Sequence, residues 1–332
     1  MDVYFTTVIR GAPVDHGGEL VWLNWATKTV RKRVPIAPTN PSIVDPNPRG
    51  NSRGGRGIAL RDGSLLAATY HSLLAFDRKL EPLGRVDNHN FVGLHEVSQD
   101  GGIVWTASTS IDAAIAVDES GRTVGSWWAR ETPRLQQLLK LTPGEIDKSA
   151  DNRLKYLGTK HAQSSHTHLN AATWHDGQLF VLLNRFGVVY NATRDELLVH
   201  RPEMRGAHNL VFTAGRMLVN DTQGRKLVVF DPKGTLVREI DLLGFPVVRD
   251  IFKRTWPQRL AGWLLGRVSK TAHFPRPIFV RGLYPSGPGR VLVGFSPASI
   301  IEIDLERAEV VDSFQYSGDL GVCVHGLVCA PD

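Results

Sequence analysis

The sequence has very few cysteines. Cys323 and Cys329 are the two in 332 residues, and both fall on one expected strand. Six residues of extended chain separate them by about 20 Å, which is too far for a disulfide. The sequence therefore shows no disulfide framework, and a reducing compartment suits it.

Long hydrophobic runs and an export signal are also lacking. No stretch reaches the ~18–20 consecutive apolar residues that a membrane-spanning helix needs. The first five residues, MDVYF, enter an expected strand directly, without the basic and apolar regions of a signal peptide. We therefore expect a cytoplasmic protein.

Neither sign of charge dominates. Lys and Arg total 39 against 33 Asp and Glu, a net charge of +6. This modest excess favours anionic small molecules, acidic surfaces or membranes as partners. No motif that reads RNA or DNA is present, so we expect no nucleic-acid partner.

A short phrase recurs along the chain. Each copy is a phrase of about four residues with an Arg or His at its start or in its second position, and most copies are followed by a Gly-containing turn and an apolar run. A repeat of this kind predicts a propeller or another array, in which one repeat cannot bury its own apolar face. We call these Arg and His residues the anchors: Arg56, His95, His168, His208, Arg281 and His325.

The spacing of the anchors predicts blades and inserts. Successive anchors are 39, 73, 40, 73 and 44 residues apart. A blade takes about 40 residues, so each long interval holds a blade plus an insert of about 33. We expect helical inserts at about 129–165 and 243–277. Their helices should span 133–141, 145–157 and 247–268, the last interrupted at Pro257.

The two ends of the chain complement one another. Residues 322–329 carry an anchor phrase without further strands, whereas 3–10, 19–25 and 29–36 read as strands without an anchor. Joining them completes a sixth blade and removes exposed sheet edges. We therefore predict an all-β fold: one six-bladed β-propeller domain over residues 1–332, closed by its C-terminal strand and carrying two helical inserts.

A loop rich in Pro, Gly and Arg spans 39–55, just before the first anchor. Long loops in compact domains are uncommon and often functional. It is either a solvated linker or a lip that brings Arg53 to the channel mouth to bind an anion.

The first strand of each propeller blade lines the central channel, so the anchors should meet at one axis. Four imidazoles and two guanidiniums would repel one another as cations. Either the histidines stay neutral, or an anion or a metal ion organises them.

Several phrases resemble the bacterial arylsulfate sulfotransferase propeller family over about residues 90–242. They are Leu94-His95-Glu96-Val97, His168-Leu169-Asn170-Ala171-Ala172, the run from Asp176 to Arg185, and Ala207-His208-Asn209-Leu210. The resemblance implies that His208 is the nucleophile that carries the sulfuryl group. It also implies that His95, His168, Asn170 and Arg185 bind sulfate and handle protons.

The residues themselves are compatible with such chemistry. An imidazole nitrogen can attack a sulfuryl or phosphoryl group, and Arg56, Arg281 or Arg185 can neutralise the charge on its oxygens. A second histidine such as His95 can protonate a departing phenolate. Strand alternation points Glu96 away from the side of His95. We expect an enzyme that acts on an anionic or aryl-ester small molecule by group transfer or hydrolysis.

Two other functions fit the same residues. His95, His168, His208 and His325 can ligate one Fe, Cu or Zn ion, as in an oxygenase or lyase. Carotenoid-cleaving oxygenases are similar in their count of four axial histidines. Alternatively, the channel is only solvated, and the protein is a non-catalytic ligand-binding or scaffold propeller. No cofactor is certain.

The second insert mixes basic residues with Trp and Leu over 247–268. Such a segment forms a helix on the propeller rim, a peripheral membrane contact, a self-association surface or a lid over the channel.

Overall fold

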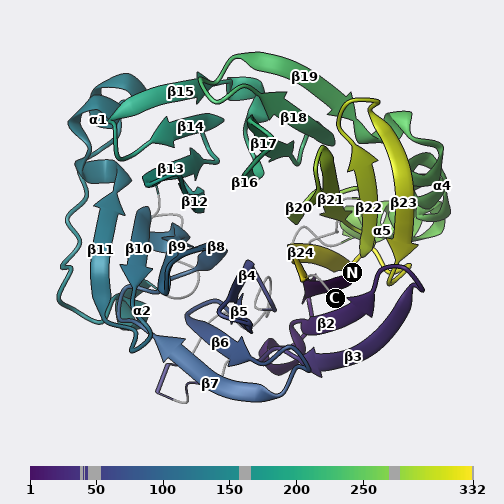
Figure 1. The fold of residues 1–332 in the computed structure, drawn as a ribbon, viewed down its shortest axis with the longest axis horizontal. Coiled ribbons are helices and arrows are strands. Elements are labelled where there is room, and N and C mark those ends of the chain that lie inside the picture. The colour runs from purple at the N-terminus through teal and green to yellow at the C-terminus, as the bar shows by residue number, and fades with distance from the viewer. Residues whose placement is uncertain (38–39, 41, 44–53, 157–165, 269–276, 331–332) are drawn as a thin grey trace.

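The computed structural model describes residues 1–37, 40, 42–43, 54–156, 166–268 and 277–330. Six four-stranded sheets stand around a common axis like the blades of a propeller (Figure 1). The predicted six-bladed β-propeller is confirmed.

Every blade is an antiparallel sheet whose strands run in order from the axis to the rim, and neighbouring blades follow one another along the chain. The first five blades are β4 (Ile58–Arg61), β5 (Ser64–Ala68), β6 (Ser72–Phe76) and β7 (Pro82–Asp87); β8 (Leu94–Asp100), β9 (Ile103–Ser108), β10 (Ala113–Val117) and β11 (Thr123–Trp128); β12 (Leu169–His175), β13 (Gln178–Leu183), β14 (Val188–Asn191) and β15 (Glu196–His200); β16 (His208–Thr213), β17 (Arg216–Asp221), β18 (Lys226–Phe230) and β19 (Leu236–Asp241); and β20 (Leu283–Gly287), β21 (Arg290–Phe295), β22 (Ser299–Asp304) and β23 (Glu309–Gln315).

The closing blade joins the two ends of the chain, as predicted. Its strands, from the axis outward, are β24 (Val322–Ala330), β1 (Asp2–Ile9), β2 (Glu19–Asn24) and β3 (Thr29–Pro35). Val3 pairs with Cys329 across the β1–β24 ladder, and the two ends lie side by side in Figure 1. The innermost strand of this blade therefore comes from the C-terminal segment, and it carries His325.

The hydrophobic core is divided among the interfaces between blades. Each of six apolar clusters joins two neighbouring blades. For example, Leu73 and Ile115 belong to the cluster between the β4–β7 and β8–β11 blades. Val3 and Ile300 belong to the cluster between the closing blade and the β20–β23 blade. Burial of these side chains is the main force that holds the blades in a ring.

Glycines next to anchors let the inner strands approach closely. A Cβ on Gly57 would lie 2.6 Å from the carbonyl oxygen of His95, and one on Gly326 would lie 2.5 Å from that of Arg56. The Gly57 N–H donates to the same His95 oxygen at 2.7 Å. A side chain at either position would therefore push the channel walls apart.

Both helical inserts are present, with two differences from the prediction. The helices are α1 (Pro133–Leu139), α2 (Asn152–Tyr156), α4 (Pro246–Arg254) and α5 (Trp256–Val268). Of the helix expected over 145–157, the structure forms only α2. The Asp147 carboxylate accepts hydrogen bonds from the Ser149 N–H and hydroxyl, and this favours a turn before α2. The second insert breaks at Thr255, and Pro257 lies in the first turn of α5, where no N–H is needed.

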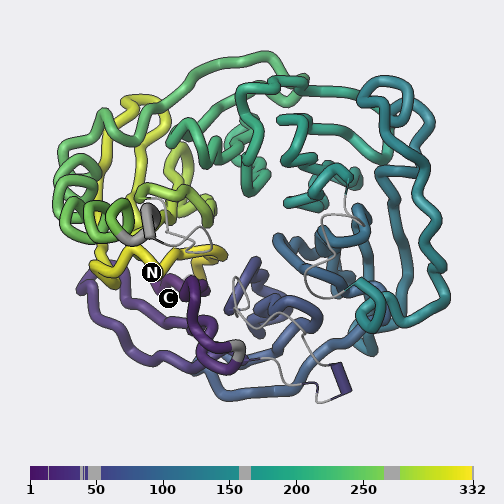
Figure 2. The backbone as a smooth tube through the Cα atoms, turned by 180° about the vertical axis from the view of Figure 1, so that it is seen from behind, coloured from purple at the N-terminus to yellow at the C-terminus, as the bar shows by residue number. Residues whose placement is uncertain are grey.

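The inserts leave the propeller at the end where the anchors lie, since each connects an outermost strand to the next innermost strand. Figure 1 and Figure 2 place α4 at the periphery of the β20–β23 blade, with α5 running inward from it across the same blade. Within the described ranges, no helix has the length and apolar character needed to cross a bilayer.

Candidate functional site

The four anchor histidines converge on the axis from four blades. The ring centroid of His95 lies 5.5 Å from that of His168, 6.1 Å from that of His208 and 5.8 Å from that of His325. Nη1 of Arg56 lies 2.9 Å from Nε2 of His95. We call these five residues together with Arg281 the central cluster.

His208 is held in one tautomer. Its Nδ1 lies 2.9 Å from the carbonyl oxygen of Gly206 and 2.8 Å from Oγ1 of Thr222. The Thr222 hydroxyl donates to the carbonyl oxygen of Val280 at 2.7 Å, so its oxygen accepts from His208. This network assigns the proton to Nδ1 and leaves a lone pair on Nε2. Within the described structure, His208 Nε2 is buried without a hydrogen-bonding partner.

His95 is held by the same arrangement two blades away. Its Nδ1 lies 3.1 Å from the carbonyl oxygen of Gly93 and 2.8 Å from Oγ1 of Thr109. Thr109 donates to the carbonyl oxygen of Leu169. The proton is again on Nδ1, so Nε2 accepts from the Arg56 guanidinium. Unlike His208, His95 has both ring nitrogens engaged.

Glu96 also enters the cluster, and the expectation that it points away from the axis is wrong. The β8–β9 register shifts between Leu94 and Val97. Such a bulge interrupts the alternation of side chains, so that neighbouring residues can both face inward. Glu96 Oε1 lies 3.8 Å from His325 Nδ1, and burial raises the pKa of the carboxyl group to about 7.

The cluster is a buried cationic site. Burial, together with nearby guanidiniums, lowers the pKa values of His95, His208 and His325 well below the ordinary histidine value, so these imidazoles are neutral at pH 7. Burial lowers the pKa of Arg281 to about 9, and the Arg10 charge acts in the same sense. The guanidiniums keep the positive charge, which an anion would offset.

Asn170 and Asp112 position the cluster. Asn170 Nδ2 donates to the carbonyl oxygen of Ala207 at 2.8 Å, directly before His208. The Asp112 carboxylate accepts from the backbone N–H groups of Thr167 and His168, each at 3.0 Å. It thereby holds His168 at a left-handed φ of 53°. Both residues act through backbone groups of the neighbouring segments.

Of the predicted site residues that the structure describes, Arg185 is not brought into the cluster. Arg185 is half-buried, and its Nη1 lies 3.4 Å from the carbonyl oxygen of His166. Among the contacts of the described residues, none joins its guanidinium to a cluster histidine. Arg53 lies outside the described residues.

Arg10 and Phe279 are site residues that were not predicted. The guanidinium carbons of Arg10 and Arg281 lie 4.3 Å and 4.6 Å from the ring centroid of Phe279. The Phe279 ring is 5.9 Å from that of His208. The Phe279 ring thus links the Arg10 guanidinium to the central cluster. No sequence motif indicates these contacts.

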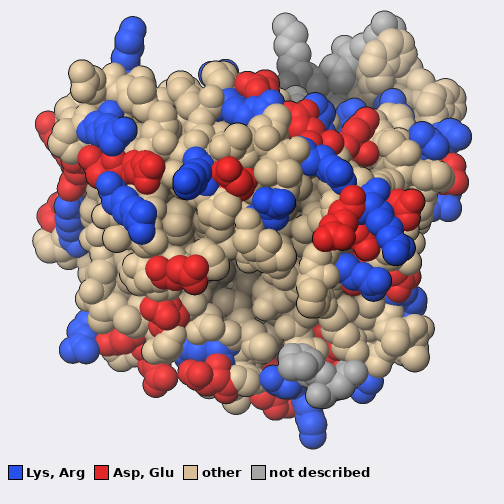
Figure 3. All heavy atoms as spheres, turned by 45° about the horizontal axis from the view of Figure 1, so that its top comes forward, with Lys and Arg blue, Asp and Glu red and all other residues tan. Residues whose placement is uncertain are grey.

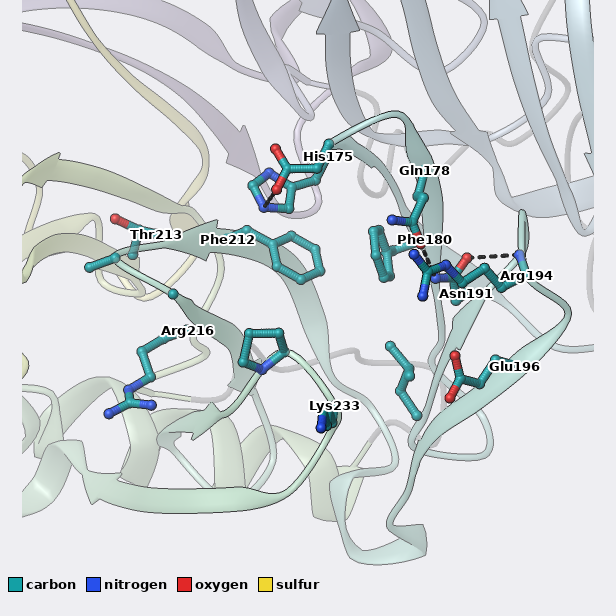
Figure 4. A pocket seen from close by; sticks show the side chains of 15 residues that line it. His175, Gln178, Phe180, Asn191, Arg194, Glu196, Phe212, Thr213, Arg216 and Lys233 are labelled. Atoms are coloured by element: carbon teal, nitrogen blue, oxygen red, sulfur yellow. Dashed lines mark hydrogen bonds and ion pairs between the residues drawn. The ribbon is translucent and has the colours of Figure 1, made fainter.

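Two hollows lie near the far end of the inner strands. A channel cavity of about 340 Å³ is lined by all six inner strands and includes Glu96. A groove of about 610 Å³ lies between the β12–β15 and β16–β19 blades (Figure 4). The rings of His175 and Phe212, stacked at 4.4 Å, line both. The channel cavity is the one that shares a residue with the central cluster.

In the part of the chain that the structure describes, neither the outer charges nor the His, Cys, Asp and Glu side chains mark a second site. Acidic and basic side chains are intermixed over the face in Figure 3. Within the described residues, no three His, Cys, Asp or Glu side chains are placed to hold a metal ion. Nε2 of His95 faces a guanidinium instead. The four-histidine metal site stays a prediction.

Comparisons with known proteins extend only to the fold. No protein-family model and no curated protein matches the chain. A crystal structure of a protein of unknown function from Bacteroides caccae is 13% identical, with a TM-score of 0.57 over 98% of this chain and 97% of that one. One chain of a nidogen/laminin complex is 9% identical to this chain, with a TM-score of 0.57 over 98% of this chain and 97% of that one. Virginiamycin B lyase from Staphylococcus aureus is 10% identical over 83% of this chain and 69% of that one, with a TM-score of 0.45. The first two likenesses concern the overall fold alone, and none of the three assigns the chain to a family.

Proposed function

We propose that the central cluster binds the oxyanion of a small aryl or other anionic ester and that His208 transfers or hydrolyses its sulfuryl or phosphoryl group. The observation that carries this proposal is the buried lone pair on His208 Nε2, fixed by Gly206 and Thr222. A neutral imidazole of this kind is a nucleophile at neutral pH.

The proposed reaction has two steps. His208 Nε2 forms a bond to sulfur or phosphorus while the ester oxygen leaves with its electron pair. An acceptor hydroxyl or water then takes the group and releases the imidazole, and its proton goes to the carboxylate left by the acid that protonated the leaving oxygen in the first step. Arg281 and Arg56 offset the charge on the transferred oxygens.

The structure favours Glu96 over His95 as the proton donor to the leaving oxygen. His95 is neutral, and its ring nitrogens are engaged with Arg56, Gly93 and Thr109. The Glu96 carboxyl group has a pKa of about 7, close to the ideal for an acid at neutral pH. It also lines the channel cavity of about 340 Å³, which is large enough for an aryl group.

The decisive experiment looks for the covalent intermediate. Untagged protein is mixed with an aryl sulfate or an aryl phosphate, quenched in a cold alkaline denaturant and digested at alkaline pH, because the bond between a histidine nitrogen and the transferred group hydrolyses in acid. Mass spectrometry should then find one sulfuryl or phosphoryl group on the peptide that contains His208. Both the adduct and the release of phenol should be lost in His208→Ala and kept in His200→Ala, which changes an exposed histidine that lies outside the cluster and lines neither hollow.

The same preparation tests the other two functions. Binding of aryl esters without an adduct or turnover would replace the proposal with a ligand-binding propeller. About one equivalent of a transition metal, lost in a His208→Ala/His325→Ala variant, would replace it with metal chemistry.

A further inference from the structure

Helix α5 exposes a stripe of large apolar side chains. Trp256 is 58% exposed, Leu260 37%, Trp263 54% and Leu264 51%. Their spacing places all four on one face of the helix. Exposed apolar clusters of this kind mark surfaces that contact a partner or a membrane.

The opposite face of α5 fixes the direction of this stripe. Thr255 and Gly262 are buried. The Gln258 side chain donates to the carbonyl oxygen of Gly318 and accepts from the Leu320 N–H, both at 2.8 Å. Since Gln258 and Gly262 lie on the side of the helix away from Trp256 and Leu260, the apolar stripe is directed away from the propeller.

Basic side chains accompany the stripe. Residues 246–264 contain four basic residues and one acidic residue, Asp250. The basic residues are Arg249, Lys253, Arg254 and Arg259. The first three basic residues are exposed and Arg259 is half-buried. Tryptophan beside Lys and Arg is the composition of helices that lie in the headgroup region of anionic membranes.

We propose that α4 and α5 form a docking surface for a membrane that contains anionic lipid, with Trp256 and Trp263 at the headgroup level and the basic residues against lipid phosphates. Charge complementarity supports this occupant over a second copy of the chain, because two copies would bring like charges together. The stripe exposes on the order of 400 Å², about half of the ~800 Å² that each partner contributes to a standard protein interface.

Docking would also orient the propeller. The insert that carries α5 leaves the ring at the end where the central cluster lies. The channel mouth on that side would therefore face the lipid headgroups. The membrane proposal does not depend on the reaction proposed for His208.

Vesicle flotation tests the surface with the full chain. Wild-type protein should float with phosphatidylcholine vesicles that contain phosphatidylserine, and more weakly with phosphatidylcholine alone or at high salt. The Trp256→Ser/Trp263→Ser variant should bind the anionic vesicles at least about tenfold more weakly. Arg249→Glu/Lys253→Glu should lose the preference for phosphatidylserine.

The matched control changes exposed apolar residues on the outermost strands. Leu83 and Val124 are 61% and 47% exposed, and Leu83→Ser/Val124→Ser should bind as wild type does. Circular dichroism establishes that each variant is folded. Absence of wild-type binding, or equal binding by the double-Trp variant, would overturn the proposal. A dimer in sedimentation that disappears in that variant, without vesicle binding, would assign the stripe to self-association instead.

Discussion

Replacement of Thr222 by valine tests whether the hydroxyl holds His208 in place. Valine keeps the shape of threonine but removes the oxygen that accepts from His208 Nδ1 at 2.8 Å and the proton that goes to the Val280 carbonyl at 2.7 Å. Each buried hydrogen bond contributes about 1 kcal/mol, and an unpaired buried carbonyl costs about 1–3 kcal/mol. His208 Nδ1 keeps the Gly206 carbonyl at 2.9 Å. We therefore expect Thr222→Val to lose about 2–3 kcal/mol of unfolding free energy.

Urea unfolding measures this loss. Thr213→Val, at the other end of β16, is the control, because within the described structure the Thr213 hydroxyl makes no hydrogen bond. It should change the unfolding free energy by less than about 0.5 kcal/mol. Nitrogen-detected imidazole spectra of the wild type should show His208 with a proton on Nδ1 and none on Nε2. A Thr222→Val protein as stable as the control, or a proton on Nε2, would refute the assigned network.

Three further outcomes follow from the cluster. Arg281→Met removes a desolvated cation, so we expect its unfolding free energy in urea to be about 1–2 kcal/mol higher than that of the wild type. Sulfate bound at the cluster should stabilise the wild type but not this variant. A lower stability of the variant, or an equal stabilisation by sulfate, would contradict the assignment. Gly57→Ala should cost about 1–3 kcal/mol, because the new Cβ meets the backbone at His95, whereas Gly244→Ala, with nothing within 4 Å, should be neutral by the same assay. The unfolding free energy should fall as the pH is lowered from 7 to 5. In the unfolded chain the histidines take up protons below a pH of about 6.5, whereas in the folded protein His95, His208 and His325 stay neutral. Each of these three histidines therefore lowers the unfolding free energy by about 1.4 kcal/mol per pH unit below about 6.5. The raised pKa of Glu96 acts in the opposite sense between pH 7 and 4.5 but concerns one group, so equal or greater stability at pH 5 would show that the imidazoles are not buried as neutral groups.

The sequence predicts the ring and the anchors because both depend on periodicity. A residue that recurs in or just before each innermost strand must lie near the axis, whatever the surrounding contacts are. His95, His208 and His325 lie there for this reason, although their phrases are short. The helical inserts were predictable from composition, but Asx turns near Asp147 shortened one helix.

The contacts that tune the site were not predictable in the same way. Asp112 reaches Thr167 and His168 across more than 50 residues of sequence, and no local pattern encodes that contact. Glu96 was misplaced because a bulge overrides strand alternation. One signal was present in the sequence: a Gly-x-His phrase is followed 14 residues later by a Thr in both Gly93–Thr109 and Gly206–Thr222.

The joining of β24 to β1 has a consequence for when the site forms. Five blades can be assembled from the chain as it emerges, but the wall that bears His325 arrives only with residues 322–330. Without this strand the ring would be an open arc, and water would reach the histidines and guanidiniums from the missing side. The desolvation that depresses the basicity of the imidazoles therefore requires the pairing of the last strand with the first. The neutral state of the cluster histidines therefore depends on completion of the ring.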